Sequence, residues 1–172
     1  AARQAEFPAR FQLVAAMNPC PCGWAGDPSV RCSCTPDQVQ RYRGRVSGPL
    51  LDRIDLHVEL PRMRGCEISP EAPRGEGSAA VRERVVAARE RALQRCGVLN
   101  ARMDQRRTEQ HCALRREDRQ LLEQAMDRLK LSARAIHRIL RTARTIADLD
   151  HAEAIATAHL SEAIGYRVID RG

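Results

Sequence analysis

Hydrophobic residues in the second half of the chain recur every three or four positions, a spacing typical of amphipathic helices. The first such segment runs from Ser78 to Gly97, and three more cover about 115–130, 132–148 and the residues from Thr157. Charged residues take the opposite face of the first segment. The pattern predicts a small bundle of four helices. The residues expected to face inward are Val81, Val85, Ala88, Ala92, Leu121, Leu122, Ala125, Met126, Leu129, Ile136, Ile139, Leu140, Ala143, Ile146, Leu160, Ala163 and Ile164.

The first 60 residues have shorter apolar runs. Residues 11–17 are apolar and lie between prolines, which favours a buried strand, and residues 54–58 alternate between apolar and polar, as in a second strand. Between them, Thr35 and Pro36 predict the cap and first position of a helix reaching about residue 45, and residues 49–53 read as one helical turn. Two strands cannot form a parallel sheet that is buried on both faces. The segment is therefore expected to be a truncated piece of an α/β domain.

Proline and glycine, without periodicity, separate these two halves over residues 62–77, which predicts a linker. The expected organisation is an α/β piece over 1–61, the linker over 62–77, and a helical domain over 78–172. The expected fold class is mainly α.

The charge of the chain is uneven. The net charge is +7, and residues 61–172, with 22 basic and 16 acidic groups, contribute +6 of it. A basic half indicates an acidic partner, such as nucleic acid or nucleotide phosphate, although arginine-rich helices are also simply well solvated. There is no run of 18 apolar residues and no signal-peptide pattern at the start. We expect a cytoplasmic protein that does not bind membranes.

Four of the seven cysteines lie close together in the sequence: Cys20, Cys22, Cys32 and Cys34 form two C-x-C pairs separated by nine residues. Two thiolate pairs on one short loop can converge on a tetrahedral zinc ion. Disulfides are the alternative, disfavoured because nothing indicates secretion. Four cysteine ligands would leave no open position for a catalytic water, so the predicted zinc is structural.

The remaining candidate ligands do not group in the sequence. The other three cysteines, Cys66, Cys96 and Cys112, are scattered singly, and the five histidines show no metal-ligand spacing. The one lysine, Lys130, is not preceded by a glycine-rich loop, so the chain contains no phosphate-binding P-loop motif. If the protein uses nucleotide, its principal phosphate loop is expected outside these residues.

Several motifs together resemble a known family. Residues 16–23 read Ala-Met-Asn-Pro-Cys-Pro-Cys-Gly, residues 50–55 read Leu-Leu-Asp-Arg-Ile-Asp, and residues 131–134 open a helix with Leu-Ser-Ala-Arg. The last two motifs, with a strand ending in Asn18, are similar to the second half of an AAA+ ATPase. The whole chain most closely resembles the magnesium-chelatase-like competence proteins (the ComM/YifB type), relatives of magnesium chelatase and of the minichromosome-maintenance helicases.

The resemblance implies roles for three residues. Asn18 matches the sensor-1 position, Arg53 the arginine finger that reaches a neighbouring subunit's ATP, and Arg134 the sensor-2 arginine. The implied cofactors are ATP and Mg²⁺ at the interfaces of a ring, expected to be a hexamer. Without the resemblance, Asn18 would simply end a strand, Arg53 would be an ion-paired surface residue, and Arg134 an ordinary first-turn residue.

The resemblance implies an ATP-driven ring motor acting on DNA, of the branch-migration helicase type. One alternative is the motor subunit of a metal chelatase, and another is a non-catalytic, zinc-bearing module that binds nucleic acid. Because the phosphate loop and the Walker-B acid are missing from these residues, the chain alone is expected to have no ATPase activity.

Overall fold

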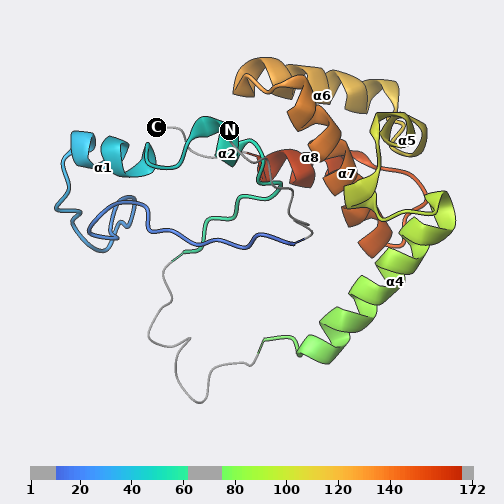
Figure 1. Ribbon diagram of the computed structural model, residues 1–172, viewed down its shortest axis with the longest axis horizontal. Coiled ribbons are helices and arrows are strands. Elements are labelled where there is room, and N and C mark those ends of the chain that lie inside the picture. Colours follow the sequence, from blue (N-terminus) through green and yellow to red (C-terminus); the bar gives the residue numbers. More distant parts are fainter. Residues whose placement is uncertain (1–10, 62–74, 168–172) are drawn as a thin grey trace, which may run out of the picture. The chain divides into compact units, whose positions relative to one another are not determined.

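The computed structural model describes residues 11–61 and 75–167. The chain divides into two compact units, Ala1–Ile54 and Asp55–Gly172. Helices dominate the described residues, none of which lies in a strand (Figure 1). The mainly α fold predicted from the sequence is confirmed.

The described part of the first unit contains two short helices, α1 (Pro36–Arg43) and α2 (Gly48–Leu51). A capping box begins α1: the Thr35 hydroxyl accepts a hydrogen bond from the Gln38 N–H at 3.3 Å, and the Thr35 N–H donates to the Gln38 side chain at 2.9 Å. These bonds satisfy backbone groups that a helix start leaves unpaired. Both helices are therefore where the cap and proline signals predicted them.

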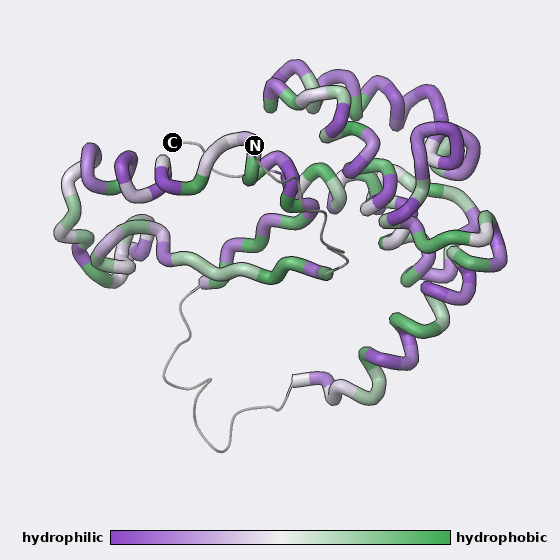
Figure 2. Tube along the Cα trace, in the orientation of Figure 1, coloured by the Kyte–Doolittle hydropathy of each residue, from purple (hydrophilic) through white to green (hydrophobic). Residues whose placement is uncertain are grey.

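The two predicted strands are not present in the described part of the chain. Residues 11–17 are extended and largely hydrophobic (Figure 2), yet Phe11 is 76% and Val14 84% exposed. Residues 54–58 likewise lack a ladder. An apolar run indicates which residues a sheet would bury, but a strand forms only when a neighbour completes its backbone hydrogen bonds. No strand lies beside either segment among the described residues, although the His57 N–H makes one backbone hydrogen bond, to the Tyr166 carbonyl.

The described part of the second unit contains all four predicted helices and two short elements that the sequence pattern did not predict. The predicted helices are α4 (Ser78–Cys96), α6 (Arg116–Leu129), α7 (Ala133–Leu149) and α8 (Thr157–Gly165). The additional elements are the 3-10 turn η1 (Asn100–Arg102) and the helix α5 (Gln105–His111). The α5 sequence has no apolar periodicity that would predict a helix. Its start is marked only by a capping residue: the Asp104 side chain accepts a hydrogen bond from the Arg107 N–H at 2.8 Å.

Helix α7 lies at the centre of the second unit, where it packs against α4, η1, α5 and α8. Its Ile139 and Ala143 are fully buried and contribute to one core with Leu160 of α8. Burying an isoleucine or leucine side chain stabilises a fold by about 1.5–3 kcal/mol, and the small alanines let the helices approach closely. Helix α6 packs against α8.

Only the second half of α4 buries the face that the sequence predicted. Ala88 and Ala92 are buried, but Val81 and Val85, one and two turns earlier, are 38% and 43% exposed. The prediction was wrong for these valines because the helix extends beyond the neighbours that the described part of this unit supplies. Helix α4 ends as expected at Gly97, whose φ of 72° is the left-handed conformation typical of a glycine cap.

A buried ionic cluster holds α4, η1 and α7 together. The Asp148 carboxylate, 1% exposed, accepts hydrogen bonds from Arg95 at 2.5 and 2.7 Å and from the Asn100 amide at 2.7 Å. It also pairs with the buried Arg144 at 3.2 Å. Arg144 in turn donates to the carbonyls of residues 152 and 153, at 2.7 and 2.8 Å. One carboxylate therefore pairs with two guanidinium groups and connects three elements.

Candidate functional site

The four clustered cysteines converge in the first unit. One ligand atom from each of Cys20, Cys22, Cys32 and Cys34 lies within 4.8 Å of all the others. The Cys22 sulfur is 3.3 Å from that of Cys20 and 3.4 Å from that of Cys32, and Cys20 and Cys32 are 3.7 Å apart. Zinc–sulfur bonds of about 2.3 Å in a tetrahedron would place the sulfurs about 3.8 Å apart. The cluster has the ligand number, chemistry and approximate size of a four-cysteine zinc site.

Backbone geometry after the first C-x-C pair shapes the loop. The Gly23 N–H donates to the Cys20 carbonyl at 3.0 Å, and the Ala25 N–H donates to the Cys20 sulfur at 3.3 Å. Gly23 and Gly26 have φ values of 84° and 86°, which favour glycine. These turns hold the Cys20 sulfur, which is buried, beside the other thiols.

The second C-x-C pair is positioned by α1. Cys34 directly precedes Thr35, the residue that caps this helix. From the last residue of α1, the Arg43 Nε donates to the Pro19 carbonyl at 3.2 Å, next to Cys20. The helix therefore connects the two ends of the cysteine loop. The Thr-Pro signal predicted the helix but not this structural role.

The environment favours a thiolate at Cys22. A hydrogen bond from the Trp24 backbone lowers the pKa of Cys22 to about 5. At Cys34 a backbone hydrogen bond involving Cys22 acts in the same direction, but burial and the neighbouring thiols outweigh it and raise the pKa of Cys34 to about 12. The pKa of Cys20 is also lowered and that of Cys32 is raised, so the cluster combines thiols that lose a proton readily with thiols that must release one when a cation binds.

We expect the 172-residue chain to bind about one zinc per molecule, more tightly at higher pH. Because the Cys34 thiol must lose a proton to bind, the apparent dissociation constant should fall about tenfold per pH unit for each proton released. Titration calorimetry in buffers of different ionisation enthalpy measures both quantities. Cys34→Ser should weaken binding strongly, whereas Cys96→Ser, in the second unit, should not. A pH-independent affinity, or equal effects of the two substitutions, would contradict the assignment.

A disulfide is not present in this loop, since its cysteines are all free and the shortest sulfur–sulfur distance of 3.3 Å far exceeds a bond of about 2.05 Å. Cys96 and Cys112 are also free, and Cys66 lies outside the described residues. Within residues 11–61 and 75–167, no second group of three or more histidine, cysteine or acidic residues comes together as metal ligands do.

The three residues matched to nucleotide-sensing positions are all exposed. Asn18 ends the extended segment that precedes the cysteine loop. Arg53 follows α2, and its Nη1 donates to the Pro49 carbonyl at 2.7 Å. Arg134 lies in the first turn of α7, whose N-terminus is capped by the Ser132 hydroxyl. Asn18 and Arg53 belong to the first unit and Arg134 to the second.

Arg134 lines a shallow hollow of about 310 Å³ between α7 and the η1–α5 region. Two further arginines of α7, Arg138 and Arg141, line it one and two turns later. Arg141 donates to the carbonyls of Ala101 and Met103, at 3.1 and 3.3 Å. The run of arginines makes this hollow suitable for an anionic group.

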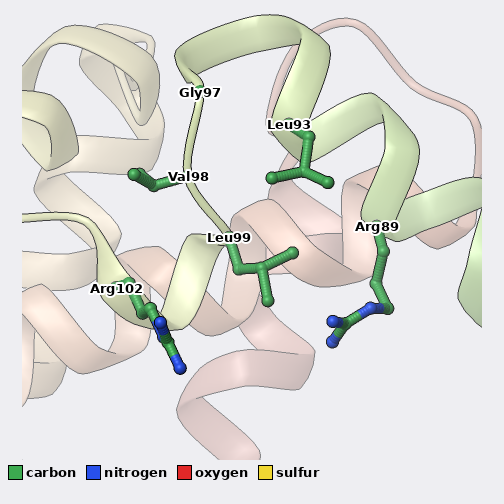
Figure 3. A pocket seen from close by; sticks show the side chains of 6 residues that line it. All are labelled: Arg89, Leu93, Gly97, Val98, Leu99 and Arg102. Atoms are coloured by element: carbon green, nitrogen blue, oxygen red, sulfur yellow. The ribbon is translucent and has the colours of Figure 1, made fainter.

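A second hollow, of about 260 Å³, lies where α4 turns towards η1 (Figure 3). Leu93 and Leu99 line its apolar part, and Arg89 and Arg102 lie at its edge. It is lined by no nucleophile, carboxylate or histidine. Among the described residues, therefore, the best candidates for binding a metal or an anion are the cysteine cluster and the α7 arginines.

Comparisons with protein families identify the chain. The model described as "Magnesium chelatase, subunit ChlI C-terminal" matches residues 75–167, and that described as "Magnesium chelatase, subunit ChlI" matches residues 1–68. The chain belongs to the magnesium-chelatase ChlI family. This confirms the resemblance seen in the motifs and identifies a chelatase-like member of the AAA+ class whose helical part matches the C-terminal family domain.

Named relatives are similar over nearly the whole chain. Competence protein ComM of Haemophilus influenzae is 47% identical over 166 residues, covering 96% of this chain and 32% of the relative. The uncharacterized proteins YifB of Escherichia coli and Salmonella typhimurium are 49% and 48% identical over 165 residues, with the same coverage. The chain thus spans about a third of the length of these relatives. None of the helices in the described part is long and apolar enough to cross a membrane.

The ion pair between Asp55 and Arg138 was not predicted from the sequence. Asp55 and Arg138, 83 positions apart, are joined at 2.8 Å. Neither residue stands out by spacing or by composition. Only the fold of the second unit brings them together.

Proposed function

We propose that this chain is the C-terminal part of a ring-forming AAA+ ATPase, acting in the cytoplasm as an ATP-driven motor on DNA. The single observation that supports it most strongly is the match of both ChlI family models, one after the other, over residues 1–68 and 75–167. The ring is expected to be a hexamer. DNA as partner is supported by the basic second half of the chain.

Arg53 is the residue that completes a neighbour's active site in this proposal. It lies just after a single helical turn and is exposed, and its guanidinium donates to the Pro49 carbonyl at 2.7 Å. A guanidinium that reaches the terminal phosphate of ATP bound by the adjacent subunit stabilises the negative charge of the transition state. ATP and Mg²⁺ supply the phosphoryl group and its charge-neutralising metal when they are bound in the full-length protein.

Asn18 and Arg134 each act on the nucleotide in this proposal. The short amide of Asn18, at the end of its extended segment, orients the attacking water. Arg134, in the first turn of α7, senses phosphate and moves the helical domain with nucleotide state. Its hollow, lined by further arginines, provides a positive environment for that contact.

Zinc has a structural role in the proposed protein. The four thiols would close its coordination shell, so the ion would hold the cysteine loop to α1 and take no part in hydrolysis. The sensor residue Asn18 lies two positions before the first ligand. Zinc binding would therefore fix the segment that carries Asn18.

The test is ATP turnover by the full-length protein with branched DNA, single-stranded DNA or no DNA. We expect DNA to stimulate hydrolysis, the branched form most, and the 172-residue chain alone to hydrolyse nothing because it lacks the P-loop. A metal-chelatase motor subunit, favoured by the family name, would instead respond to a tetrapyrrole-inserting partner and not to DNA. A full-length protein without any ATPase activity would refute both, and would favour the zinc-bearing nucleic-acid module.

A further inference from the structure

The segment that follows Arg53 is anchored to the helices of the second unit at two points. The Arg138 Nη1 of α7 donates to the Asp55 carboxylate at 2.8 Å. Two residues later, the His57 N–H donates to the Tyr166 carbonyl, directly after α8, at 2.9 Å. One bond is a charge-assisted side-chain contact and the other a backbone contact. Residues 55–57 therefore follow α7 and α8 as part of the same compact unit.

Both partners of the ion pair lie next to residues with a proposed role. Asp55 is two positions after Arg53, so two peptide units, at most about 7 Å of extended chain, separate the two α-carbons. Arg138 is four positions after Arg134, on the same face of α7, and both line the same hollow. The pair thus connects the immediate neighbourhoods of the two arginines through the backbone of α7 and a very short piece of chain.

We propose that the Asp55–Arg138 ion pair is a coupling contact that transmits the position of the helical domain to Arg53. This inference rests on the function proposed above, since it takes Arg134 as the nucleotide sensor and Arg53 as the finger. When Arg134 engages an anion, α7 shifts as a rigid helix and carries Arg138 with it. Arg138 moves Asp55 through their ion pair. Because the connection between Asp55 and Arg53 is short, Arg53 moves as well. By linkage, placing Arg53 on a neighbour's nucleotide also favours one position of α7.

The exposure of the pair separates a coupling role from a structural one. The side chains of Asp55 and Arg138 are 59% and 23% exposed, and ion pairs this exposed contribute little to folding stability. Substituting them should therefore leave the fold intact. A change in turnover then reports the coupling itself.

Charge reversal in the full-length protein provides the test. Asp55→Arg and Arg138→Asp each place like charges together, and we expect each to lower kcat about tenfold at saturating ATP. For Asp55→Arg, which does not alter the hollow of Arg134, the Kd for ATP should change less than about twofold. The double variant restores the attraction with exchanged partners and should recover kcat to within about twofold of wild type. The matched control is Glu76→Arg, which places like charges together in the exposed Glu76–Arg84 ion pair, 2.7 Å long. This variant should leave kcat unchanged.

Two results would overturn the coupling role: Asp55→Arg with wild-type kcat, or a double variant no more active than the single ones. Failure of the proposed function is read separately in the same assay. It would appear as absence of turnover by the wild type, or as full turnover by Arg53→Ala. Normal wild-type turnover, loss in Arg53→Ala and no effect of Asp55→Arg would refute only the coupling contact.

Discussion

Arg53→Ala in the full-length protein should reduce ATP turnover by at least about 10³-fold while ATP binding changes less than about twofold. The guanidinium acts on charge that develops during phosphoryl transfer, so its loss raises the barrier without removing a ground-state contact of the nucleotide's own subunit. Steady-state hydrolysis and equilibrium binding of a fluorescent ATP analogue measure the two quantities.

The control for this substitution is Arg45→Ala, which removes another exposed arginine of the same unit. It should keep wild-type turnover. Arg53 would lose its assigned role if Arg53→Ala hydrolysed ATP normally, or if it failed to bind ATP at all. Equal losses in both variants would indicate a general effect of charge on this unit.

Asp148→Asn should destabilise the helical unit by about 3–5 kcal/mol, the largest stability effect that we expect from a single polar substitution in this chain. The carboxylate is 1% exposed and pairs with Arg95 and with Arg144, itself 2% exposed. An amide removes the negative charge and leaves the buried Arg144 and the partly buried Arg95 without an anionic partner. Urea unfolding of the chain, followed by helical circular dichroism, measures the change.

The matched control, Asp127→Asn, removes an exposed carboxylate of α6 and should change stability by less than about 0.5 kcal/mol. A similarly small effect of Asp148→Asn would mean that the buried cluster does not hold these elements together.

The same cluster predicts how stability depends on pH. Burial alone would raise the pKa of Asp148, but hydrogen bonds from Arg95 and Asn100 outweigh it, and the pKa lies below its usual value. The stabilisation is therefore fully present above the unfolded pKa of about 3.9 and is lost as pH falls through the lower folded value. The difference in stability between wild type and Asp148→Asn should shrink only below about pH 4.

The elements predicted correctly are those whose signals are local. Thr35 and Pro36 mark the start of α1, Ser132 caps α7, and Gly97 ends α4, because caps depend on a few neighbouring residues. The convergence of the cysteines was also predictable, since two C-x-C pairs on one short loop have few ways to lie apart.

What could not be predicted depends on contacts between distant parts of the sequence. The apolar run of 11–17 has no strand partner among the described residues, and Val81 and Val85 lie beyond the neighbours that would cover them. The contacts of Asp148 with Arg95 and Asn100 and the Asp55–Arg138 pair join residues 48 to 83 positions apart, and no sequence motif marks them. The roles of Asn18, Arg53 and Arg134 rest on the family resemblance and stay predictions.

The central claim is that Arg53 of one subunit completes the ATP site of the next, and mixed assemblies test it most directly. Full-length Arg53→Ala would be mixed with a full-length variant whose phosphate-loop lysine is replaced, each inactive alone. If the finger acts across a head-to-tail ring interface, an equal mixture should regain about a quarter of wild-type turnover, because about a quarter of interfaces then join an intact loop to an intact finger. A mixture that stays inactive, while both variants assemble and Arg53→Ala binds ATP, would contradict the claim.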